Sequence, residues 1–148
     1  MKLLVPIDLS AATAGVLDTA RRVASATRGA VWLLNVAPPD PAFIGYEVGP
    51  EVVRGQVARE LREDHRALQA HAQSLRDAGI EVTALHIQGS TAETILREAA
   101  RLPADLIIMA THGHGAVFDL LVGSISQAVL RASPVPVLMV PARNAPAA

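Results

Sequence analysis

The stretch DLIIMATHGHGAVFDLLVGSISQAVL, residues 105–130, decides the fold of this chain. It begins as an apolar run typical of a buried strand and continues through a loop that contains two glycines and two histidines. It then resumes as an apolar helix with Gly-Ser at its start. A buried strand followed by a helix is half of a βαβ unit, in which right-handed crossovers join parallel strands.

The same alternation of strand and helix covers the rest of the chain, and no repeat or second apolar unit interrupts it. We therefore predict a single doubly wound α/β domain at 1–142, with a five-stranded parallel sheet and helices on both faces, followed by a frayed tail at 143–148. The strand order is expected to be 3-2-1-4-5, although periodicity alone does not fix it. The expected strands are 2–7, 30–36, 80–87, 105–110 and 134–140, and the expected helices are 10–28, 51–78, 90–101 and 124–132. Gly29 is expected to end the first of these helices.

Composition narrows the functional class. The chain has 148 residues, a net charge of -1 and a pI of about 6.5, so no general attraction to nucleic acid or to an anionic membrane is expected. No apolar run reaches the roughly 18 residues of a membrane span. The chain has no cysteine, which excludes disulfides and thiolate metal sites and is compatible with the cytoplasmic location that we expect.

The predicted strand order places a ligand crevice between the first and fourth strands, which end at Asp8 and at Met109-Ala110. Gly123-Ser124 lies near the start of the last helix, where backbone N–H groups and the helix dipole favour a phosphate. Gly113 could let that phosphate approach the backbone. An alternative stays open, since the glycines could simply permit a turn and Ser124 could cap the helix.

The spacing of these residues resembles a known pattern. Gly113, nine intervening residues, Gly123-Ser124, an apolar helix and a closing PVPVLMV resemble the nucleotide-binding signature of the universal stress protein family, G-x2-G-x9-G-[S/T]. The first glycine of that signature is Ala110 in this chain. The resemblance spans essentially the whole sequence and implies membership of the nucleotide-binding, UspA-like subgroup.

The resemblance also implies a set of contacts that runs from the nucleoside to the phosphates. In that order, the contacts are Pro6, Ile7 and Asp8 at the nucleoside, Val36 at the adenine, Met109, Ala110 and Gly113 along the ribose and phosphate, and Gly123, Ser124 and Ile125 at the phosphates, with His114 beside them. Two alternatives stay open: Asp8 could cap the following helix, and Val36 and Met109 could serve only core packing.

The implied ligand is ATP or AMP, whose phosphates could hold Mg²⁺ or Mn²⁺. A protein-only metal site is not expected, because His112 and His114 supply too few ligands. The implied assembly is a homodimer through the last strand, at Val135, Val137 and Met139.

We expect a regulatory nucleotide binder of the stress response with no catalytic residue. The alternatives are a slow ATP hydrolase or phosphotransferase, or a family member with a non-nucleotide ligand. No P-loop motif is present, and Lys2 is the only lysine that could neutralise phosphate charge.

Overall fold

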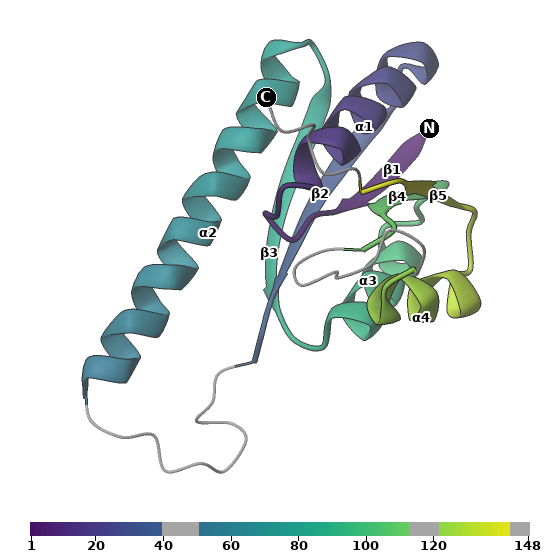
Figure 1. Cartoon of the computed structure of the whole chain (residues 1–148). Coiled ribbons are helices and arrows are strands. Elements are labelled where there is room, and N and C mark those ends of the chain that lie inside the picture. Colours follow the sequence, from purple (N-terminus) through teal and green to yellow (C-terminus); the bar gives the residue numbers. More distant parts are fainter. Residues whose placement is uncertain (40–50, 113–121, 143–148) are drawn as a thin grey trace.

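The computed structural model describes residues 1–39, 51–112 and 122–142, with the side chains of 51–53 excepted. Strands and helices alternate from the first element to the last (Figure 1). The elements are β1 (Lys2–Pro6), α1 (Thr13–Thr27), β2 (Ala30–Ala37), α2 (Glu51–Asp77), β3 (Glu81–Gln88), α3 (Thr91–Arg101), β4 (Leu106–Ala110), α4 (Ser124–Ala132) and β5 (Val137–Val140).

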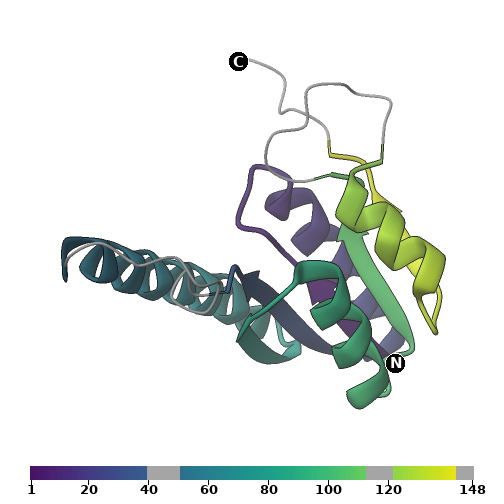
Figure 2. The ribbon, with the colours of Figure 1, turned by 90° about the horizontal axis from the view of Figure 1, so that it is seen from below.

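The sheet is parallel throughout and has the order β3-β2-β1-β4-β5, which confirms the predicted fold class and topology. Side chains on successive strand residues point to opposite faces of the sheet. Leu3 accordingly joins the core cluster beneath α1 and α2, and Leu4 joins the cluster beneath α3 and α4. Figure 2 shows the sheet between these two helix pairs. Within the described residues, no helix is long and apolar enough to cross a membrane.

The residue that ends α1 is not the one that the sequence predicted. Gly29 was expected to terminate the helix, but Arg28 takes the left-handed conformation, with φ 51°, and donates its N–H to the carbonyl of Ala24. Gly29 is required for a different reason: a Cβ at this position would stand 2.7 Å from the carbonyl oxygen of Met1. This glycine therefore allows the chain to enter β2 close beside the start of β1.

The last strand is shorter than predicted, because it begins at Val137 rather than at Pro134. Ser133 interrupts the ladder: its Oγ accepts a hydrogen bond from the N–H of Val135 and donates one to the carbonyl of that residue. Pro134 and Pro136 have no N–H to contribute. The result is a four-residue edge strand at one side of the sheet.

Candidate functional site

The central feature of the site is the point at which β1 and β4 separate. These strands pair only at Leu3–Leu106 and Leu4–Ile107. The carbonyl of Lys2 accepts the N–H of Asp105, so the backbone groups of Lys2 point toward β4. The backbone groups of every second strand residue point to the same side, and those of Pro6 therefore also point toward β4. Pro6 has no N–H, and the ladder between β1 and β4 therefore cannot continue there. The sheet opens at its topological switch, where the sequence predicted a ligand.

The segment after β1 is held in a specific turn. The Oδ1 of Asp8 accepts the N–H of Ser10 at 3.0 Å, and Leu9 between them has a positive φ of 61°. A left-handed conformation is costly for a residue with a branched side chain, so surrounding contacts must hold it. The N-cap of α1 is Ala12, without a side-chain cap. Asp8 is therefore not the cap of that helix, and it is an exposed residue that follows β1 at the edge where β1 and β4 separate.

A buried amide fixes this turn from below. Asn35 in β2 is only 5% exposed, and its Nδ2 donates to the carbonyl of Ile7 at 3.0 Å. The N–H of Ile7 in turn donates to the carbonyl of Leu34. Two bonds from β2 thus anchor the residue immediately before Asp8. Sequence reasoning missed Asn35, although it is the one polar residue in an apolar strand, AVWLLNVA.

The start of α4 is fastened to the end of β4 by two hydrogen bonds. The N–H of Gly123 donates to the carbonyl of Thr111 at 2.8 Å, and the buried Ser126 donates through Oγ to the carbonyl of Ala110 at 3.0 Å. Sequence reasoning also missed Thr111 and Ser126. A Cβ at Gly123 would lie 3.3 Å from the Cβ of His112, so this glycine permits a close approach of the two segments.

This arrangement presents backbone donors at the same edge of the sheet as Asp8. The first helical bond of α4 runs from the N–H of Gln127 to the carbonyl of Gly123. The N–H groups of Ser124, Ile125 and Ser126 precede that bond, and such first-turn groups have no partner within their own helix. With the positive end of the helix dipole, they form a position that suits an anion. Gly123 contributes space rather than a donor, because its own N–H is bonded to Thr111.

The predicted site residues fall into three groups. Asp8, Ser124 and Ile125 are exposed at the crevice, where Ala110 and Gly123 are half-buried. Gly113 and His114 lie outside the described residues. The remaining four lie on strands or directly after one, and their side chains are turned wholly or partly into the core: Pro6, Ile7, Val36 and Met109.

At the strand ends that the structure describes, the side chains that could bind a metal directly are few. No group of three or more His, Cys, Asp or Glu side chains in residues 1–39, 51–112 and 122–142 is arranged to hold a metal ion. His112, one of the two histidines considered from the sequence, has its Nδ1 3.1 Å from the hydroxyl of Thr111.

Known proteins match this sequence along its length. The sequence profile of the universal stress protein family matches residues 1–141. This chain belongs to the universal stress protein family. A universal stress protein of Thermus aquaticus is 34% identical over 122 residues, which are 82% of this chain and 84% of that relative.

Solved structures show the same fold. The chain superposes on MJ0577, a universal stress protein of Methanocaldococcus jannaschii, with a TM-score of 0.80, 26% identity and 97% of each chain covered. Two other neighbours were solved with nucleotides. A universal stress protein in complex with cAMP has a TM-score of 0.69 and 19% identity, over 97% of this chain and 98% of the other. A universal stress protein from Archaeoglobus fulgidus in complex with dAMP has a TM-score of 0.67 and 17% identity, over 95% of this chain and 97% of the other.

Proposed function

We propose that this universal stress protein is a cytoplasmic regulatory protein that binds an adenine nucleotide, ATP or AMP, between the ends of β1 and β4. One observation carries the proposal: the N-terminus of α4 is fastened to the end of β4 at the point where β1 separates from it. A phosphate at that helix terminus and a nucleoside toward Asp8 would span the crevice. The cAMP and dAMP complexes of two structural neighbours support an adenine nucleotide as the ligand class.

The residues at the crevice fit such a ligand. The N–H groups of Ser124 and Ile125 would face the phosphates, and the carboxylate of Asp8 would accept from the nucleoside. Val36 lies two residues beyond the last β1–β2 pair, Pro6–Leu34, as Asp8 does on the other chain segment, and would contact the adenine. Gly113 and His114 belong to the same proposed site by their positions in the signature. Mg²⁺ or Mn²⁺ would be held through the phosphates.

The position of the lysine favours binding over hydrolysis. Lys2 is the only lysine and is the first residue of β1, whereas the crevice opens after the last residue of that strand. Five strand residues separate the two by roughly 15 Å. Rapid phosphoryl transfer requires a cationic clamp on the phosphates. We therefore expect ATP turnover far below the usual enzyme range of about 1–1000 per second.

Replacing Gly123 tests the proposal. In Gly123→Val, the added side chain would press on His112 and fill the path of the phosphate. We expect ATP affinity measured by titration calorimetry to fall at least tenfold. Gly55→Val is the matched control, because a Cβ at Gly55 meets nothing within 4 Å. Unchanged affinity in Gly123→Val, with circular dichroism showing a folded chain, would contradict the site.

The edge strand β5 favours a homodimer as the functional assembly. The carbonyls of Pro136 and Val140 face β4, where they accept the N–H groups of Ile107 and Thr111. Alternation therefore turns the backbone groups of Val137 and Met139 toward the open edge. A second copy could pair there by two-fold symmetry. The contact would use backbone, because the side chains of Val135, Val137 and Met139 pack against the core beneath α3 and α4.

A further inference from the structure

A groove of about 760 Å³ lies between α2 and the edge strand β3, and β2 separates it from β1 and the nucleotide crevice. Its volume is within the range of about 300–1,000 Å³ that is common for small-molecule sites. The side chains that line it come from two elements: Leu61, Arg62, His65, Arg66 and Gln69 from α2, and His86 and Gln88 from β3.

The groove begins where the apolar core ends. Val82 and Ala84 pack beneath α2 as part of that core. His86 and Gln88 follow in the same row of β3, because alternate residues share a face. On the helix, Leu68 is fully buried, whereas Leu61, two turns nearer the N-terminus, is half-buried and forms an apolar wall. This α2–β3 groove therefore continues the contact between α2 and β3, with polar side chains in place of the apolar ones of the core.

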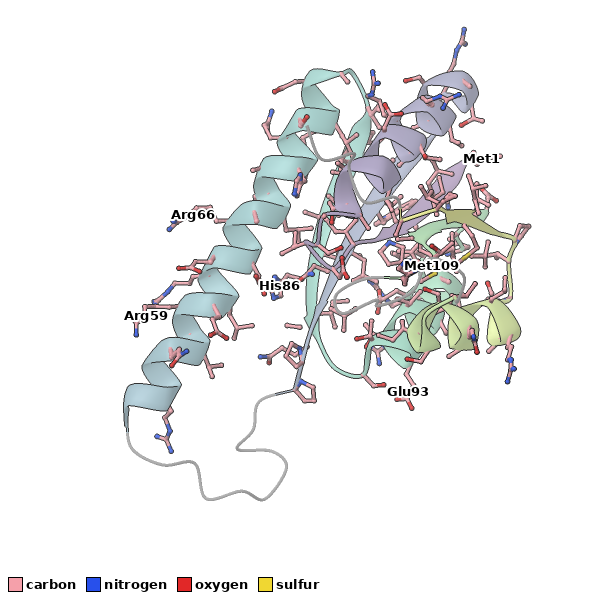
Figure 3. All side chains as sticks on the ribbon, in the orientation of Figure 1. Met1, Arg59, Arg66, His86, Glu93 and Met109 are labelled. Carbon is pink, nitrogen blue, oxygen red and sulfur yellow. The ribbon has the colours of Figure 1, made fainter. Side chains whose placement is uncertain are left out.

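The lining carries cationic groups and no carboxylate. Arg62 and Arg66 stand one turn apart on α2, and neither forms an ion pair within the part of the chain that the structure describes. Like charges four residues apart destabilise a helix modestly, and an anion between them would reverse that effect. In Figure 3 the exposed side chain of Arg66 extends from α2 on the side away from β3 and His86, so it must change rotamer to reach a ligand in the groove.

His86 supplies an independent sign of a ligand. It lies between α2 and the sheet (Figure 3), and both of its ring nitrogens are buried without a hydrogen-bond partner among the described residues. The ring of His65 stands over it, with 6.0 Å between ring centroids. Leaving a buried polar group without a partner costs about 1–3 kcal/mol, so such groups mark places where a bound molecule can supply one.

We propose that the α2–β3 groove binds a small phosphate monoester at a site separate from the nucleotide crevice. Arg62 and Arg66 hold the phosphate oxygens with charge-assisted hydrogen bonds. His65 turns aside, and His86 then donates from the floor of the groove to the same group. The organic part of the ester lies against Leu61. A phosphate suits two guanidinium groups better than a carboxylate does, because it carries a charge between -1.5 and -2 at neutral pH.

Titration of the full chain with phenyl phosphate tests this site. At low ionic strength, the ring C–H signals of His65 and His86 are followed by NMR. We expect saturable shifts of both, at least tenfold weaker binding in the double variant Arg62→Gln/Arg66→Gln, and no shift with the neutral benzyl alcohol. Arg59→Gln is the control and should bind normally, because Arg59 is exposed on the same helix but does not line the groove.

Three further results bear on the proposal. Saturating ATP should leave the binding of phenyl phosphate unchanged, and displacement by ATP would place it in the nucleotide crevice instead. Inorganic phosphate should bind at least threefold more weakly, since it leaves Leu61 uncovered, and equal affinity would overturn the ester assignment. Absence of saturable His65 and His86 shifts, or equal weakening by Arg59→Gln, would overturn the site itself. Because the test does not use the nucleotide, its failure leaves the proposed ATP site untouched.

Discussion

The two halves of the sheet on either side of β1, β4–β5 and β2–β3, are built on the same alternation of strand and helix but present different chemistry. On the β4–β5 side, the wall of the crevice that faces Asp8 consists of backbone groups, a glycine and the start of a helix. On the β2–β3 side, the α2–β3 groove consists of long polar side chains from α2 and β3. The first should therefore be sensitive to a Cβ added at Gly123, and the second to the loss of side-chain charge.

The two edge strands, β3 and β5, also differ in whether a side chain covers their outward backbone groups. At the β3 edge, Arg76 of α2 donates through Nε and a terminal nitrogen to the carbonyl of Val82, at 3.2 and 3.0 Å. That side chain covers a backbone acceptor which could otherwise pair with another strand. At the β5 edge, the outward backbone groups belong to Val137 and Met139, and no side-chain hydrogen bond reaches them within the described residues. We therefore expect association at β5 and not at β3.

Val137→Pro should produce the largest effect, a complete change from dimer to monomer. The substitution removes an N–H that faces the open edge, and proline is tolerated at such positions. Val137→Ala is the control, since it retains the N–H and should remain dimeric. Light scattering checks both variants. A wild-type monomer at micromolar concentration, or a dimeric Val137→Pro variant, would show that the edges do not differ in this way.

Asn35→Ala should have an intermediate effect, because this residue connects β2 to the turn before the crevice. The change leaves the buried carbonyl of Ile7 without its side-chain donor. We expect the free energy of unfolding in urea to fall by about 1–3 kcal/mol. Thr83→Ala, at an exposed position on the neighbouring strand, should stay within about 0.5 kcal/mol of the wild type. Equal stability of the two variants would show that the hydrogen bond of Asn35 does not stabilise this turn.

Ala110→Gly should have the smallest effect. Ala110 occupies the first glycine of the family signature, but what the structure uses here is its carbonyl, which accepts the hydroxyl of Ser126. Glycine would keep that carbonyl and remove only a methyl group. We expect the Kd for ATP to change by less than about threefold, or about 0.7 kcal/mol. A tenfold tighter Kd in titration calorimetry would mean that the methyl group obstructs the ligand.

The sequence predicted the sheet well, because apolar runs such as LLNV and LIIMA fix the strands, and glycine and proline mark their ends. It also predicted that the ends of β1 and β4 and the start of α4 would lie at one edge of the sheet. It could not predict the bonds that hold them there. Asn35 and Ser126 act through partners 28 and 16 residues away, a pairing that depends on register rather than on local pattern. The prediction that Gly29 would end α1 was wrong, because Arg28 takes the left-handed cap conformation. Gly29 is needed for its close contact with Met1, which the sequence does not reveal.

Backbone amide mapping by NMR during ATP titration tests the central claim most directly, because the proposed phosphate contacts are backbone N–H groups. The account predicts the largest shifts at Ser124, Ile125 and the segment around Asp8, with His86 and the rest of the α2–β3 groove unaffected. Shifts confined to α2 and β3, with Ser124 and Ile125 unchanged at saturating ATP, would contradict it.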